Sequence, residues 1–240
     1  MQRELEQLIN QIHDKGLRKK VHDLIQNPAV SLKGMKKMGL PLSRSPAGKT
    51  HHHSYPEGLV EHMIATSRVA LALCDSVEKT YRGKINRDLV RAGILLHDIF
   101  KPATYVEKED GTYGMSLLGE RLDHLSILLG ELYQRKMPIE LLHVIAAHHG
   151  RAGPISPRTV EALIVHVADV ADSTLNGEVL YAAKFILRDC TGEELEMLTS
   201  EEAFNIVFAK QTKGCEGVRE ELEKIKRKRC AKGKVAGAGS

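Results

Sequence analysis

The sequence predicts an all-α protein. Apolar residues recur at helical spacing in several segments, including residues 2–26, 59–77 and 157–172, and this period places them on one face of a helix. Strand-like alternation is almost absent, and aromatic residues make up only 4% of the chain. A chain of 240 residues with 42% apolar composition is long enough for one large helical domain, with or without an appendage.

The first region, residues 1–50, is expected to contain one amphipathic helix over residues 2–26 and then a long loop. Proline, glycine and serine are frequent from Asn27 to Gly58, and these residues interrupt helices. Within this loop, the stretch from Ser43 to Thr50 offers hydroxyls and two cations, which either bind an anion or belong to a solvated linker. It is not a Walker A motif, because the second glycine and a preceding apolar strand are missing.

The central region, residues 51–190, is expected to be helical throughout. The helical pattern restarts at Leu59, continues from the cap residue Asn86 to Lys101, where Pro102 ends it, and returns over residues 117–135. Further helices are predicted from Pro138 to Gly150, after the capping pair Ser156-Pro157, and over residues 178–189. The polar segment 107–113 carries an Asp-Gly turn signal, which is typical of a short hairpin or a loop.

The last region begins with a helical extension, residues 191–228, in which Thr199 and Glu202 are expected to form a capping box. A disordered tail is predicted for residues 229–240. The net charge is +4, and much of the excess comes from the run Lys224–Arg229. Such a run is either a solvated end or a contact with nucleic acid.

Composition excludes several classes of protein. No apolar run approaches twenty residues, and the charged start lacks the apolar region of a signal peptide, so we expect a cytoplasmic protein with no membrane partner. The four cysteines lie far apart and form no CxxC pair. This spacing favours reduced thiols over a zinc ribbon or a disulfide framework.

Metal-binding side chains interrupt the apolar pattern of five predicted helices. Any one of them is most simply a buried polar residue with a hydrogen-bond partner, but five intrusions into one helical core indicate a shared partner, a pair of divalent ions. One ion would be held by His62, His97, Asp98 and Asp169, and Asp98 would bridge to a second ion held by His124, His148 and His149. Histidine with carboxylate favours transition ions (Fe, Mn, Co, Ni or Zn) over calcium or magnesium.

The order His62…His97-Asp98…Asp169 resembles the signature of the HD-domain phosphohydrolases, and His124 with His148-His149-Gly150 resembles the expanded form with a second metal. The resemblance runs from about residue 52 to 175. It implies an HD-domain helical bundle with an N-terminal helix and additional C-terminal helices, and metal-dependent hydrolysis of a phosphate ester with Fe or Mn as the first expectation. One departure is Phe100, where many relatives have glycine, which affects the placement of Lys101.

Several stretches, including residues 52–55, 58–62 and 166–169, are similar to bacterial 3′–5′ exoribonucleases and to archaeal phosphodiesterases that open the cyclic phosphate of dihydroneopterin in pterin cofactor synthesis. An exoribonuclease commonly carries a separate strand-binding barrel with stacking aromatics. In this chain about fifty residues precede His52, and they are predicted to form a helix and a loop. This favours a small cyclic phosphodiester over RNA, which stays the second choice. A nucleotide-sensing module without catalysis is the third alternative.

Further residues are expected to act outside the metal ligands. Asp98 and Lys101 are the expected catalytic residues, since Lys101 follows Asp98 by three positions and shares its helical face. The expected substrate-binding residues are His52, His53, Arg121, Lys101 and His166, although His52 and His53 equally well order their loop. The sequence leaves the oligomeric state open, with a homo-oligomer as one alternative.

Overall fold

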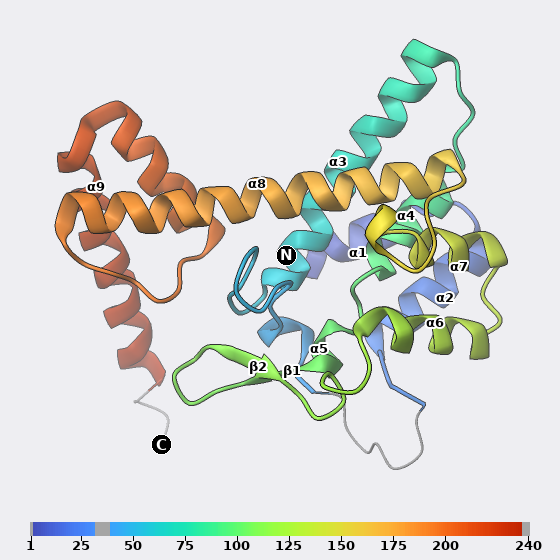
Figure 1. The fold of residues 1–240 in the computed structure, drawn as a ribbon, viewed down its shortest axis with the longest axis horizontal. Helices are drawn as coiled ribbons and strands as arrows, with labels where there is room; N and C mark the ends of the chain where they lie inside the picture. Colours follow the sequence, from blue (N-terminus) through green and yellow to red (C-terminus); the bar gives the residue numbers. More distant parts are fainter. Residues whose placement is uncertain (1, 32–38, 237–240) are drawn as a thin grey trace. The chain divides into compact units, whose positions relative to one another are not determined.

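The structure, a computed structural model, describes residues 2–31 and 39–236 and is built almost entirely from helices (Figure 1), which confirms the all-α prediction. The elements are α1 (Gln2–Asn10), α2 (Lys15–Gln26), η1 (Leu42–Arg44), α3 (Gly58–Tyr81), α4 (Arg87–Leu96), α5 (Lys101–Thr104), β1 (Tyr105–Glu107), β2 (Tyr113–Met115), α6 (His124–Gln134), α7 (Ile139–Ala146), η2 (Gly150–Ala152), α8 (Val160–Thr191) and α9 (Ser200–Ala236).

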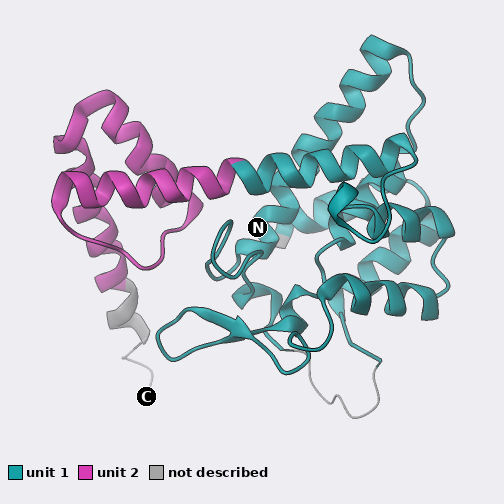
Figure 2. Cartoon of the chain, in the orientation of Figure 1, with its two compact units in different colours: residues 1–174 teal, residues 175–240 magenta. Residues whose placement is uncertain are grey.

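The chain divides into two compact units, residues 1–174 and 175–240 (Figure 2). The boundary falls inside α8, because this helix runs without a break from the first unit into the second. The predicted helices 157–172 and 178–189 are therefore parts of one helix. The unit boundary precedes residue 190, where sequence analysis placed the end of the central domain.

Helix α4 lies at the centre of the first unit, in contact with α2, α3 and α7. It is buried along most of its length, as expected for a short helix surrounded by others. Close packing explains Gly93, because a Cβ there would lie 2.5 Å from Val144 Cγ1 and 3.2 Å from Val165 Cγ2. The end of this rigid helix presents the His97-Asp98 pair.

Several predicted helix boundaries were wrong because polar side chains cap the backbone inside the expected helices. The predicted helix 2–26 is two helices, since Asp14 accepts a hydrogen bond from Leu17 N and starts α2. Asp123 caps α6 in the same way through Ser126 N, so residues 117–123 form turns. At the start of α8, Thr159 rather than Ser156-Pro157 provides the cap, through Ala162 N. The helix from Asn86 ends at Leu96 instead of Lys101.

The hairpin predicted around the Asp-Gly signal is confirmed. Strands β1 and β2 pair antiparallel, with Val106 opposite Gly114. The described part of the preceding loop is also ordered: Ser45 is buried and its carbonyl accepts from Leu59 N, and Arg44 pairs with Glu107 of β1. Residues 45–48 are thus buried, whereas Ser43, Arg44, Lys49 and Thr50 at the two ends of the stretch are exposed. Residues 32–38 of the predicted loop lie outside the described residues.

The second unit has its own apolar core between the end of α8 and α9. The predicted capping box is present, since Thr199 N donates to Glu202 Oε2 and Glu202 N donates to Thr199 Oγ1. Helix α9 continues through Ala236, so residues 229–236 are helical instead of disordered, and Arg229 donates to the Met197 carbonyl and to Glu202. Residues 237–240 lie outside the described part.

The prediction of reduced cysteines is wrong for Cys190 and Cys215, which form a disulfide across 25 residues of sequence. The folding of α9 against α8 brings together two cysteines that no local motif connects. Cys74 and Cys230 are free. In the part of the chain that the structure describes, no helix is long and apolar enough to cross a membrane.

Candidate metal centre

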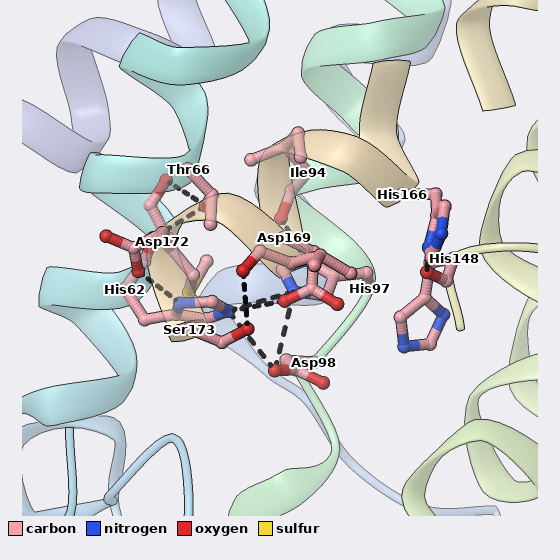
Figure 3. A network of polar contacts seen from close by, with 12 residues as sticks. His62, Thr66, Ile94, His97, Asp98, His148, His166, Asp169, Asp172 and Ser173 are labelled. Atoms are coloured by element: carbon pink, nitrogen blue, oxygen red, sulfur yellow. Dashed lines mark hydrogen bonds and ion pairs between the residues drawn. The ribbon is translucent and has the colours of Figure 1, made fainter. Parts of the chain in front are cut away.

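His62 in α3 is fully buried and lies at the centre of a polar network (Figure 3). Its Nδ1 lies 2.7 Å from Asp172 Oδ2, and a carboxylate accepts, so Nδ1 carries the proton. The opposite nitrogen, Nε2, lies 3.2 Å from both His97 Nε2 and Asp169 Oδ1. His62 Nε2 therefore points to a position shared with other metal-binding side chains.

His97 and Asp98 occupy the turn between α4 and α5. The Nδ1 of His97 donates to the Ile94 carbonyl at 2.7 Å, one of the carbonyls left free where the helix ends. This bond orients His97 Nε2 toward Asp98 Oδ2 at 3.4 Å and Asp169 Oδ1 at 3.7 Å. His62, His97 and Asp169 each offer a ligand atom within 4.8 Å of the others, and Asp98 Oδ2 lies 3.6 Å from His62 Nε2.

A second group lies on the other side of Asp98. His124 at the start of α6 and the pair His148-His149 after α7 offer ligand atoms within 4.8 Å of one another. His124 Nε2 lies 3.2 Å from Asp98 Oδ1, while His148 Nδ1 donates to the Ile145 carbonyl at 2.7 Å and leaves Nε2 free to bind. The two oxygens of Asp98 thus face the two groups, which is the arrangement expected of a bridging carboxylate.

Unsatisfied polar atoms show that this donor set fits metal ions. Among the described residues, His148 Nε2 is buried without a hydrogen-bond partner, and both Asp98 oxygens and His124 Nε2 are buried with ion-pair neighbours (Lys101 and each other) but no hydrogen bond of normal geometry. Buried polar atoms are normally paired, and leaving one unpaired costs about 1–3 kcal/mol. Divalent ions at this centre would satisfy all four atoms at once.

The electrostatics keep the carboxylates ionised. Burial alone would raise the pKa of Asp98, but the Lys101 ammonium, at 2.5 Å from Oδ2, and His97 hold it well below its usual range. Burial alone would also raise the pKa of Asp169, but the neighbouring His62 and His97 hold it well below its usual range. Burial, followed by the neighbouring His97, lowers the pKa of His148 to about 3. A neutral imidazole and an ionised carboxylate are the forms that bind metals.

His62 is different, because three carboxylates surround it. Burial opposes its charged form, but hydrogen bonds with Asp169 and Asp172 outweigh burial and raise the pKa of His62 to about 9. Without an ion, a proton on His62 Nε2 partly balances the negative charge of these carboxylates. A metal ion at the centre would replace that proton.

The predicted substrate-binding residues occupy different positions. His52 lies beside the centre, with its ring centroid 5.3 Å from that of His62 and its Nε2 buried without a hydrogen-bond partner in the described structure. Burial, and then the charge of Lys101, lower the pKa of His52 to about 3. Arg121 is exposed in the turns before α6, and no described contact joins it to the metal ligands.

His53 and His166 have protein partners. His53 is buried between Tyr55, whose hydroxyl lies 2.9 Å from Nδ1, and Asp172, whose Oδ2 lies 2.9 Å from Nε2. His166 donates from Nδ1 to the His148 carbonyl at 2.7 Å and covers Gly150, where a Cβ would lie 2.4 Å from its ring. His166 therefore fixes the turn that carries His148.

Asp172 in α8 was assigned no role from the sequence. The structure shows that it orients His62 and anchors His53. The signal available in the sequence was that Asp172 follows Asp169 by three positions and so lies on the same face of α8. Phe100, the departure from the family pattern, is buried in the core and leaves Lys101 in contact with Asp98.

Comparisons with known proteins agree with this geometry. The HD domain family model matches residues 59–174. The dihydroneopterin 2′,3′-cyclic phosphate phosphodiesterase of Methanocaldococcus jannaschii is 38% identical over 219 residues, which cover 91% of this chain and 86% of that protein.

Bacterial relatives match a shorter segment. The 3′-5′ exoribonucleases YhaM of Shouchella clausii and Oceanobacillus iheyensis are 31% and 33% identical over 153 residues, or 59% of this chain. The chain covers 46% of the length of each of these exoribonucleases. No solved structure gives a significant match. The helical core, the His-Asp centre and these relatives together show that the chain belongs to the HD-domain family of metal-dependent phosphohydrolases.

Proposed function

We propose that this protein is a phosphodiesterase that hydrolyses a small cyclic phosphate of the dihydroneopterin 2′,3′-cyclic phosphate type. The observation that carries the proposal is the position of Asp98 between two groups of ligands, each with its own histidines. Two ions about 3.5–4 Å apart are a common arrangement for phosphoester hydrolysis. The relative that aligns over 91% of the chain bears the name of this activity.

The centre would hold two divalent transition-metal ions. His62, His97, Asp98 and Asp169 would bind one, and Asp98, His124, His148 and His149 the other. Histidine with carboxylate suits Fe or Mn, with Co, Ni and Zn as alternatives, because such sites discriminate by geometry and metal availability. When bound, these ions supply Lewis-acid activation of water and of the phosphoryl group.

The side chains around the ligands would act on the substrate. Lys101 is buried and charged beside Asp98, so its ammonium can stabilise negative charge that develops on the phosphoryl oxygens. His52 is neutral, and its unpartnered Nε2 can exchange a hydrogen bond with the substrate. His53 would support His52 by fixing the loop, since both of its ring nitrogens already have partners.

A small substrate is favoured over RNA by the charges of the second unit. Most cations of the basic run 224–229 form ion pairs with acidic residues of the same unit. This pairing reduces the positive charge that is left to attract the phosphate backbone of RNA. The ion pairs are Lys224–Glu221, Lys226–Glu193, Lys228–Glu201 and Arg229–Glu202. The exoribonuclease remains the second candidate, because relatives with that name match 59% of the chain.

The direct test is a substrate panel with metal-reconstituted protein. Initial rates would be compared on dihydroneopterin 2′,3′-cyclic phosphate, on 2′,3′-cyclic AMP and on single-stranded RNA. We expect ring opening of a small cyclic phosphate to be fastest. Processive shortening of RNA from its 3′ end at a comparable rate would favour the exoribonuclease, and bound metal without turnover of any substrate would favour a nucleotide-sensing module.

We expect a cytoplasmic protein, and a homo-oligomer is compatible with its exposed apolar residues on α8, such as Leu163 and Val167. Light scattering of the metal-loaded protein would measure its mass directly. A mass equal to that of one chain would exclude the homo-oligomer.

A further inference from the structure

The second unit contains a cluster of reactive side chains that the phosphodiesterase does not use. Cys190, near the end of α8, and Cys215 in α9 form a disulfide. The Nζ of Lys210 lies 3.1 Å from the Sγ of Cys190 and 3.0 Å from the Sγ of Cys215. A single ammonium group therefore contacts both sulfurs.

The backbone brings these groups together at a break in α9. Gly214 has φ 64° and ψ −151°, which are not helical values, and glycine adopts a positive φ with little strain. The break allows Cys215 to face Cys190, although Lys210 and Cys215 belong to the same long element. The cluster is formed entirely within residues 175–240.

The surroundings of the two cysteines differ. Cys190 is 5% exposed within the apolar core of the second unit, whereas Cys215 packs against the edge of that core and is half-buried. Among the described residues, Asp189 also faces the cluster, with its Oδ2 at 3.6 Å from Lys210 Nζ. A disulfide in an apolar core needs no cation, whereas an ammonium beside a sulfur stabilises the thiolate, the form that reacts.

We propose that Cys190 and Cys215 form a thiol–disulfide exchange site for low-molecular-weight thiols and disulfides, in which Lys210 stabilises the attacking thiolate. Cys215 is the entry thiol because it is the more accessible of the two. Cys190 is the resolving thiol.

The Cys215 thiolate attacks one sulfur of a small disulfide, whose S–S bond breaks to release one small thiolate and leave a mixed disulfide on Cys215. Cys190 gives its proton to solvent and attacks the Cys215 sulfur, which releases the second small thiolate. The two protein sulfurs are oxidised, and the small disulfide is reduced to two thiols after they take up protons. Two small thiols drive the reverse reaction.

The first test uses peptide mapping by mass spectrometry of the full chain. Reduced protein treated with oxidised glutathione should give the Cys190–Cys215 cross-link, and reduced glutathione should remove it. Cys190→Ser should accumulate a glutathione adduct on Cys215, whereas Cys215→Ser should leave Cys190 unmodified over the same time. Absence of the cross-link, or equal adducts in the two variants, would overturn the proposal.

The second test isolates Lys210. Alkylation of Cys215 by iodoacetamide would be followed against pH, with the exposed Cys230 of the same chain as the internal reference. Lys210→Met should move the Cys215 profile to higher pH, and Lys210→Arg, which keeps a cation and guards against a folding defect, should move it less. The matched control is Lys213→Met, since Lys213 pairs with Glu220 at 2.8 Å. An unchanged Cys215 profile in folded Lys210→Met would overturn the role of Lys210.

Discussion

Asp172 Oδ2 accepts hydrogen bonds from His62 Nδ1 at 2.7 Å and from His53 Nε2 at 2.9 Å. One carboxylate on α8 therefore orients a candidate metal ligand on α3 and anchors the loop that carries His52. Burial would raise the pKa of Asp172, but the hydrogen bonds from His53 and His62 outweigh it and lower that pKa to about 2. The acceptor is thus ionised at neutral pH.

Asp172→Asn should weaken metal binding, because the amide no longer provides a charged acceptor that fixes the tautomer of His62. Loss of such an outer partner typically reduces metal affinity about 10–100-fold. Calorimetric titration of the metal-free protein with Mn²⁺ measures this change in metal affinity. Thr174→Ala, at an exposed position two residues further along α8, is the control, and equal affinity in the two variants would contradict the role of Asp172.

Asp98→Ala should abolish phosphodiesterase activity and remove bound metal, because Asp98 is the group that faces both sets of histidines. Metal content by mass spectrometry and initial rates are the two measurements. Asp110→Ala, in the hairpin turn, should keep both. Full activity of Asp98→Ala would refute the two-metal centre.

Lys101→Met should lower kcat by about 10²–10³-fold, the usual effect of removing one donor that stabilises transition-state charge. Since Lys101 is not a ligand, the variant should still bind two ions per chain after reconstitution. Lys108→Met on the hairpin serves as the charge-matched control. A variant that has lost its metal would instead show that Lys101 acts by supporting Asp98.

The metal-free protein should be most stable near pH 6.5. The pKa of His62 is raised to about 9 by Asp169 and Asp172 despite burial, so its stabilising effect is complete below 6.5 and is lost as the pH rises through 9. Burial lowers the pKa values of His52 and His148 to about 3, so stability also falls as the pH drops below 6.5. Thermal unfolding across pH 4–10 tests this, and His62→Gln should remove the alkaline decrease.

Two glycine substitutions should have opposite effects on unfolding free energy. Gly93→Ala places a Cβ 2.5 Å from Val144 Cγ1, and overpacking of this kind costs about 1–3 kcal/mol. Gly130→Ala lies in α6 with no neighbour within 4 Å of its Cβ, so helix propensity alone should stabilise by about 0.5–1 kcal/mol. Urea unfolding measures both, and a stable Gly93→Ala would mean that α4 and α7 pack less tightly than described.

Helical periodicity predicted the core helices, because burial of one face repeats every three or four residues. Helix ends were less predictable: Asp14 and Asp123 cap helices from inside periodic stretches, and periodicity does not distinguish a cap from an exposed polar residue. The His-Asp residues could be found because each interrupts an apolar run. The roles of His53 and His166 were harder to predict. The atom that faces each ring nitrogen decides whether a histidine contacts a substrate or a protein partner.

The chain's own residue order determined the helical class, the seven candidate ligands and the HD family, since all of these depend on local spacing and residue type. Folding alone decided that the two oxygens of Asp98 face different histidine groups, that Asp172 joins His53 to His62, and that Cys190 meets Cys215 beside Lys210. The contacts of Asp98 with His124, of Asp172 with His53 and His62, and of Cys190 with Cys215 join residues 25 to 119 positions apart. The physical reason is that such contacts depend on how whole helices pack, and packing depends on the complete set of side chains in the core.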